Sequence, residues 1–437
     1  MSNFSDTSNS GPGAFSQSSD LTKRIFYTLF VLIIYRFCTY VPIPGIDPDS
    51  LKNFLTGNER SLLGMFNLFA GGAVQRMAIL TLGIMPYISA SIIIQLLTGV
   101  TEYFKNLKAQ GEFGRRKITQ YTRYGTVLLA LIQGYGVSVS LENSPGIVLE
   151  AGIYFRFVTT ITLVTGTILI MWLGEQITAR GIGNGISLII FSGIVAEIPG
   201  ALASTFELGR TGAISSVVIL SILILLLGAI YFIVFVERAQ RRILIQYPKR
   251  QMGNKIYGGE SSYLPLKVNT SGVIPAIFAS ALLLLPITLS NFSTTSNSFM
   301  LSVTSMLGQG KPLYMLFYAS GIIFFSFFYT SIIFNPVETS DNLKKHGGFV
   351  PGIRPGEKTS EFIQSLLTKL TVIGSVYLVI ICLLPEVLIS KYPIPFYLGG
   401  TSLLIVVVVA MDTITQVQTR MMSAQYASLI KKTKFSK

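Results

Sequence analysis

Residues 214–236 read ISSVVILSILILLLGAIYFIVFV, a run of 23 residues that contains no charged side chain. About 20 consecutive apolar residues are enough for a helix to cross the hydrocarbon core of a bilayer. The run is continuous rather than alternating, which favours a helix over a strand of a membrane barrel. This stretch therefore predicts a membrane-spanning helix.

Similar apolar runs lie on both sides of it. They cover residues 25–40, 78–97, 124–141, 153–172, 185–198, 273–289, 313–334, 370–384 and 396–411. The composition agrees, because half of the 437 residues are hydrophobic and only 12% are charged, against about 25% in soluble proteins. We predict an all-α polytopic membrane protein with ten transmembrane helices. By parity alone, these form two inverted five-helix halves, with a functional site expected at the interface between them.

The distribution of basic residues predicts the orientation of these helices. With both termini in the cytoplasm, 26 Lys and Arg residues lie in cytoplasmic segments and seven lie on the outer side. Membrane proteins carry such an excess in their cytoplasmic loops. The whole net charge of +14 then lies on the cytoplasmic face.

The chain is expected to have four parts. They are a disordered cytoplasmic tail at 1–20, the first half with spans one to five at 21–212, the second half with spans six to ten at 213–415, and a cytoplasmic tail at 416–437. The first tail is rich in Ser, Asn and Gly and has no apolar core.

Three connecting segments are unusual. The cytoplasmic loops 237–270 and 335–365 mix basic residues with Gly and Pro, so we expect structured protrusions with turns. The outer segment 61–76 is apolar but too short to span, and Gly71-Gly72 interrupts it. Such a segment must line a cavity or be buried in protein, and an ordinary re-entrant packing element is the alternative.

The sequence contains little that would support a catalytic site. The single histidine, His346, excludes a histidine pair, and Cys38 and Cys382 lie in apolar runs typical of small core residues. The GIGNG sequence at 181–185 resembles part of a phosphate-binding loop, but it follows a membrane span and predicts a turn that opens a helix. We expect no enzyme activity, no metal and no cofactor.

A solute transporter is the main alternative class. It would need charged groups near the membrane midplane, but the span interiors have almost none, and Arg36, Glu197 and Asp412 lie near span ends. An uncharged passage suits a wide, normally closed pore whose apolar constriction excludes ions by dewetting.

Eight motifs, in this order, resemble the SecY family of protein-conducting channel subunits, in its bacterial form. They are LGIMPYISASIIIQ at 82–95, MWLGEQIT at 171–178, GIGNGIS at 181–187, VFVERAQRRI at 234–243, LPLKVN at 264–269, GVIPAIFAS at 272–280, FVPGIRPGE at 349–357 and GGTSLLIVVVV at 399–409. The resemblance extends from about residue 23 to residue 432.

The resemblance implies a channel that passes unfolded secretory polypeptides across the membrane and releases transmembrane segments sideways into lipid. It also implies that the two inverted five-helix halves surround a central pore, and that a ring of aliphatic side chains forms the waist of this pore. Matched motif by motif, the ring consists of Ile84, Ile88, Ile190, Ile277 and Ile405. Taken without the resemblance, each of these isoleucines is expected to face lipid or the protein core.

The resemblance also assigns a plug and a lateral gate. Segment 61–76, with Phe66, Asn67, Gly71 and Gly72, matches the plug, and the glycine pair predicts its hinge. The gate is expected between the second and third spans and the seventh and eighth. Polar Gln95 and Asn269 flank that seam, although helix-end residues facing water are the alternative.

The two basic loops match the docking site of the family for ribosomes and for the SecA ATPase. The candidate residues are Arg238, Arg241, Arg242, Lys249, Arg250, Lys344, Lys345 and Arg354. Ribosomal RNA phosphates would bind such residues in a salt-sensitive manner. A topology signal alone would explain many of them.

Further partners implied by the resemblance are the subunits SecE and SecG, signal peptides, nascent polypeptides and membrane lipid. The implied location is the bacterial plasma membrane, where the chain is a multi-pass protein driven by SecA or the ribosome.

Overall fold

The computed structural model describes residues 19–47, 71–142, 146–212, 215–248, 250–252, 255–257, 261–290, 311–391 and 400–435. Most of the predicted tail at 1–20 and the first ten residues of segment 61–76 lie outside the described residues. The chain is a polytopic helical membrane protein. Among the described residues, seven helices are long and apolar enough to cross a membrane.

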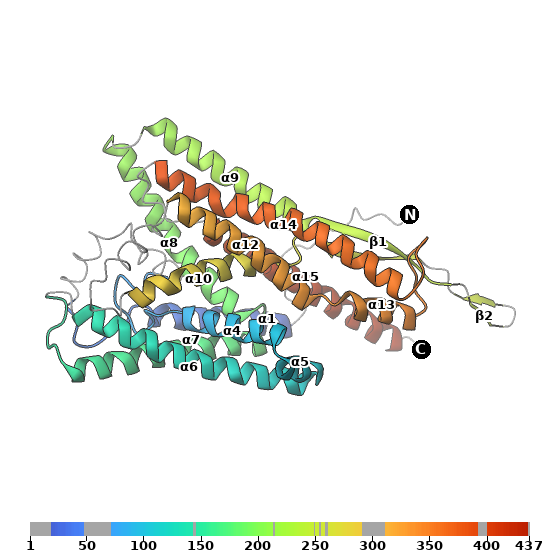
Figure 1. Cartoon of the computed structure of the whole chain (residues 1–437), viewed down its shortest axis with the longest axis horizontal. Helices are drawn as coiled ribbons and strands as arrows, with labels where there is room; N and C mark the ends of the chain where they lie inside the picture. The colour runs from blue at the N-terminus through green and yellow to red at the C-terminus, as the bar shows by residue number, and fades with distance from the viewer. Residues whose placement is uncertain are drawn as a thin grey trace. The chain divides into compact units, whose positions relative to one another are not determined.

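Each predicted apolar run falls on a helix (Figure 1). These helices are α1 (Ser19–Cys38), α4 (Met85–Val100), α6 (Glu112–Glu142), α7 (Ile153–Arg180), α8 (Gly185–Arg210), α9 (Ser216–Arg238), α10 (Ile274–Ser290), α12 (Pro312–Ile333), α14 (Glu357–Lys391) and α15 (Gly400–Phe435). The shorter helices α5 (Glu102–Ala109) and α13 (Pro336–Lys345) follow α4 and α12.

Some helix ends differ from the prediction. The run at 78–97 was expected to be helical throughout, but α4 begins only at Met85. Met77 and Gly83 have positive φ angles of 39° and 55°, which interrupt a right-handed helix, so the residues before Met85 form turns. At the other end of the chain, α14 begins inside the predicted loop 335–365, and α15 continues through most of the predicted tail 416–437.

The chain divides into two compact units, and each is described on its own. Unit 1 comprises Met1–Ser91, Arg116–Leu202 and Ile405–Lys437, and unit 2 comprises Ile92–Arg115 and Ala203–Leu404. The units follow the predicted halves except that residues 92–115 and 203–212 group with the second half and the residues from Ile405 with the first. The halves themselves stay a prediction.

Unit 1 is built around α7. Leu163 and Val164 of this helix pack with Ile43, Leu82 and Ala130 in one buried apolar cluster. Helix α1 lies against α7 as well. An apolar face therefore holds the turns before α4 against the centre of the unit.

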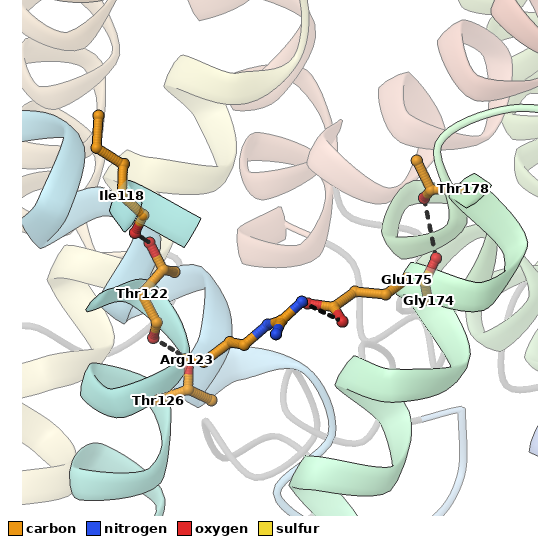
Figure 2. A network of polar contacts seen from close by, with 7 residues as sticks. All are labelled: Ile118, Thr122, Arg123, Thr126, Gly174, Glu175 and Thr178. Atoms are coloured by element: carbon orange, nitrogen blue, oxygen red, sulfur yellow. Dashed lines mark hydrogen bonds and ion pairs between the residues drawn. The ribbon is translucent and has the colours of Figure 1, made fainter. Parts of the chain in front are cut away.

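An ion pair joins α6 to α7 in the same unit (Figure 2). Arg123 donates from Nε and Nη2 to the two carboxylate oxygens of Glu175, each at 2.8 Å. The two side chains are 48% and 28% exposed, so solvent screens the pair and its contribution to stability is about 1 kcal/mol or less. The paired fork geometry fixes the relative rotation of the two helices more than it stabilises them.

Unit 2 contains α10, α12 and α14, which pack successively against one another. A β-hairpin lies between α9 and α10 in the chain. Strand β1 (Gln240–Gln246) pairs antiparallel with β4 (Ser261–Lys267), and β2 (Arg250–Met252) pairs with β3 (Lys255–Tyr257) further along (Figure 1). The described residues of the predicted loop 237–270 therefore include two pairs of antiparallel strands.

The closeness of α7 to the turn before α4 yields a test of the packing in unit 1. A Cβ on Gly166 would collide with the carbonyl oxygen of Ile79, which is backbone and cannot rotate away. We expect Gly166→Ala to cost about 1–3 kcal/mol of stability and to lower the thermal unfolding temperature of the purified protein in detergent.

Gly228→Ala is the matched control, because this glycine also lies inside a helix but has open space where the Cβ would be. It should be neutral or stabilise by up to about 1 kcal/mol. Equal unfolding temperatures for the two variants would contradict the close contact at Gly166.

Candidate functional site

The isoleucines of the predicted ring are mostly buried. Ile84, Ile88, Ile190 and Ile405 of unit 1 are 2%, 6%, 4% and 1% exposed. Ile277 of unit 2 is half-buried on α10. A lipid-facing position is therefore wrong for the four residues of unit 1, while core packing and a closed ring both agree with their burial.

The start of α4 places two of these residues on one face. The amide of Ile88 donates to the carbonyl of Ile84 at 3.0 Å, so the two side chains lie one helical turn apart. Gly83, with its positive φ, lets the chain turn directly into this helix.

The Gly71-Gly72 pair of the predicted plug is a buried turn. Both glycines have positive φ, 63° and 80°, a conformation that residues with a Cβ rarely adopt. Phe66 and Asn67 lie outside the described residues. The turn is packed on two sides, because a Cβ on Gly71 would lie 2.9 Å from Cα of Gly193 in α8 and 3.3 Å from the hydroxyl of Tyr35 in α1.

Charged side chains surround this turn. Arg36 of α1 donates from Nη1 to the carbonyl oxygen of Gly71, and a Cβ on Gly72 would collide with a carboxylate oxygen of Glu197. The guanidinium of Arg76 stacks 4.2 Å from the ring centre of Tyr40. The sequence interpretation of Arg36 and Glu197 as ordinary span-end charges missed this grouping, since only the fold brings α1 and α8 to the turn.

The GIGNG sequence is a turn that opens α8, as predicted. Three of its backbone amides donate hydrogen bonds to side chains of other helices in unit 1. Ile182 donates to Oγ1 of Thr28 at 3.1 Å, Gly183 to Oε1 of Gln416 at 3.0 Å, and Gly185 to Oγ1 of Thr178 at 2.9 Å. These amides tie α1, α7 and α15 together instead of binding phosphate.

Of the predicted gate residues, Asn269 is buried in unit 2 and Gln95 is half-buried on α4. Asn269 is 3% exposed, so the alternative that it faces water is wrong. Its side-chain amide donates to Oε1 of Glu237 at 2.6 Å and to the carbonyl of Gly272 at 3.1 Å. Ser271 donates to Oδ1 of Asn269 at 3.1 Å. Glu237, also buried, was not among the predicted site residues.

The two predicted loops meet in unit 2. Gln246 at the end of β1 and Phe349 exchange two backbone hydrogen bonds, of 2.9 and 3.0 Å. Beneath them lies an apolar cluster that includes Ile243, Leu266 and Val350. The predicted protrusions at 237–270 and 335–365 therefore form one structured body.

The candidate docking residues lie on this body. Those whose side chains are described are all exposed, namely Arg238, Arg241, Arg242, Lys344, Lys345 and Arg354. The backbone of Arg250 forms part of β2, and Lys249 lies outside the described residues.

Arg354 is presented on a fixed turn. Gly352 and Gly356 on either side have positive φ, 81° and 103°. Ser340 of α13 donates to the carbonyl of Gly356 at 2.6 Å, and Thr359 donates to the carbonyl of Arg354 at 2.9 Å. Within the described residues the guanidinium itself makes no hydrogen bond or ion pair.

Comparisons with known proteins agree on one family. The sequence profile of the SecY family matches residues 78–414. The protein translocase subunit SecY of Rickettsia bellii is 55% identical over 421 residues, which is 95% of this chain and 97% of the relative. The subunit of the same name from Escherichia coli K12 is 52% identical over 418 residues, 94% of each chain.

Solved structures show the same fold. The chain resembles "The structure of a protein conducting channel" with a TM-score of 0.67 and 17% identity, over 92% of this chain and 93% of that one. Sec61 in the canine ribosome-channel complex gives a TM-score of 0.63 at 17% identity, with the same coverage. From the matched residues and the shared length, this chain belongs to the SecY family.

Proposed function

We propose that this chain is the pore subunit of a bacterial protein translocon. It passes unfolded secretory polypeptides across the plasma membrane and releases transmembrane segments sideways into lipid. The observation that carries the proposal is the identity of 52–55% with protein translocase subunits over almost the full length of both chains. The fold of protein-conducting channels supports it.

The pore constriction is assigned to Ile84, Ile88, Ile190, Ile277 and Ile405. Branched aliphatic side chains fit around translocating chains of any sequence without binding them, and they resist wetting when no chain is present. The burial of the four members in unit 1 supports a closed constriction.

The plug is assigned to segment 61–76, with Gly71 and Gly72 at its end. The close packing of Gly71 against Gly193 and Tyr35, and of Gly72 against Glu197, supports a firmly held end of the plug. The lateral gate is assigned to the seam flanked by Gln95 and Asn269, where an apolar signal sequence would enter.

SecA and the ribosome are proposed to dock on the body formed by the two loops, and to supply the driving force for a chain that is not itself an enzyme. The ribosome-bound Sec61 relative supports the second partner. SecE and SecG are proposed as further subunits. The excess of basic residues in these loops and in the tail 416–437, together with Lys23 and Arg24 before the first span, supports cytoplasmic termini.

Depletion of the protein in its bacterial host tests the function directly. Several unrelated precursors with signal sequences should accumulate uncleaved, as measured by pulse labelling and immunoprecipitation. Normal maturation of all of them after depletion would show that the chain is not the export channel.

The constriction is tested by Ile190→Ser, which places a hydroxyl in the proposed ring and lowers the barrier to wetting. We expect the resting ion conductance of the purified channel in planar bilayers to rise several-fold. Ile189→Ser is the control, because Ile189 is equally buried but packs beside Gly174 of α7. If both variants leave conductance at the wild-type level, Ile190 does not form the constriction.

Arg354→Glu tests the docking surface. Since the guanidinium has no partner in the described chain, the substitution should preserve the turn while it repels an acidic or phosphate-bearing partner. SecA-driven translocation into proteoliposomes should fall at least about tenfold. Lys358→Glu, an exposed charge reversal four residues away, should have a smaller effect. Loss of the Arg354→Glu protein from the membrane would indicate a structural role instead.

A further inference from the structure

The end of α12 leaves a backbone carbonyl without its helical donor. In a continuing helix, the carbonyl of Ile332 would accept from the amide of residue 336, but residue 336 is proline and has no N–H. Asn335 begins a new helix there, since its side chain accepts from the amides of Val337 and Glu338 at 3.2 and 3.4 Å. The carbonyl of Ile332 therefore needs a donor from elsewhere.

Lys108 supplies that donor. Its Nζ lies in the last turn of α5 and donates to the carbonyl of Ile332 at 3.0 Å. Both residues belong to unit 2, although 224 positions separate them in the sequence. A cation at a helix C-terminus also interacts favourably with the helix dipole.

A second contact lies close to the first. Gly99, near the end of α4, approaches α12 so closely that a Cβ there would lie 3.2 Å from Cζ of Phe328 and 3.3 Å from Cδ1 of Ile332. The ring of Phe328 is held in turn by stacking on Phe324, with ring centres 6.1 Å apart. The absence of a side chain at Gly99 is therefore what lets α4 and α12 meet.

Gly99 in α4 and Lys108 in α5 lie just beyond the second predicted span, and they contact the end of the eighth. These two spans belong to opposite sides of the proposed lateral gate, and the contacts lie at the ends that the predicted topology places in the cytoplasm. We propose that Gly99 and Lys108 form a clasp with Phe328 and the carbonyl of Ile332, and that this clasp holds the cytoplasmic end of the gate closed until a signal segment separates α4 from α12. The inference rests on the proposed channel function. Gly99 and Lys108 are positioning residues, which set how hydrophobic a segment must be to enter.

The clasp has a simple energetic consequence. While Lys108 is bound, opening leaves the carbonyl of Ile332 without a protein donor. A strongly apolar signal segment compensates by burying more surface in lipid, and a weak one does not. Loss of the clasp should therefore favour weak signals selectively, whereas general destabilisation of the channel would impair all precursors.

Lys108→Met tests the hydrogen bond, because methionine keeps most of the apolar stem and removes the donor. We expect processing of a precursor with a shortened apolar signal core to rise about twofold, the lower end of the range for one hydrogen bond, because this bond is exposed to water. Processing of the precursor with an intact signal should stay at the wild-type level. Lys105→Met removes the same charge from the same short helix and should match wild type with both precursors.

Gly99→Val tests the close approach, since its side chain would force Phe328 and Ile332 outward. It should raise processing of the weak-signal precursor as Lys108→Met does. Val100→Leu, at the exposed neighbouring position, should not. Immunoblots of membrane fractions establish that each variant accumulates.

A crosslink tests whether the clasp must open. Gly99→Cys and Ile332→Cys, combined with Cys38→Ser and joined by a short bismaleimide, should block insertion of signal segments, and each single-cysteine variant should remain active. The clasp is refuted if the crosslinked channel inserts signals at the uncrosslinked rate, or if Lys108→Met and Gly99→Val both match wild type.

These outcomes stay separate from the proposed function. Each variant is expressed as the only copy of the protein in a strain from which the wild-type protein has been depleted, and the wild-type chain is re-expressed in parallel. If the wild-type chain restores export and the variants process both precursors as the wild type does, only the clasp is refuted. Failure of the wild-type chain to restore export removes the channel function itself.

Discussion

Backbone groups freed at a helix break must find new partners, and this requirement links the helices of each unit. A buried amide or carbonyl left unpaired costs about 1–3 kcal/mol, and at an exposed helix end a protein group can take the place of water. Arg36 binds the carbonyl of Gly71, Thr28 binds the amide of Ile182, and Lys108, in an exposed position, binds the carbonyl of Ile332. Each donor or acceptor comes from a helix remote in sequence, so each of these breaks is also a junction.

Glycine has a related role at these junctions. Helices in lipid gain little from burying apolar surface against each other, so close backbone approach and packing hold them together. A Cβ on Gly185 would strike the carbonyl of Gly174, and a Cβ on Gly166 would strike that of Ile79. Helix breaks and close backbone contacts at glycine therefore occur in the same regions of the fold.

The sequence predicts the spans well and their junctions poorly. Long apolar runs identify helices by length alone, and every predicted run falls on one. The early start assigned to α4 fails because apolarity does not distinguish a helix from a buried turn, and the positive φ of Met77 depends on the surrounding fold. The contact of Lys108 with Ile332 has no local signal, although Asn335-Pro336 does show that a carbonyl will need a donor.

The candidate site shows the same division. The exposure of the candidate docking residues follows from their charge and from Pro/Gly turns, whereas their docking role and the isoleucine ring follow only from resemblance. Neither approach identifies Glu237, whose buried carboxylate accepts from Asn269 where α9 passes into β1 and β4 approaches α10. That bond joins both ends of the hairpin directly to membrane helices. A partner bound at the proposed docking residues Arg241 or Arg354 would act on a body with its own apolar core, which a hydrogen-bonded junction connects to α9 and α10.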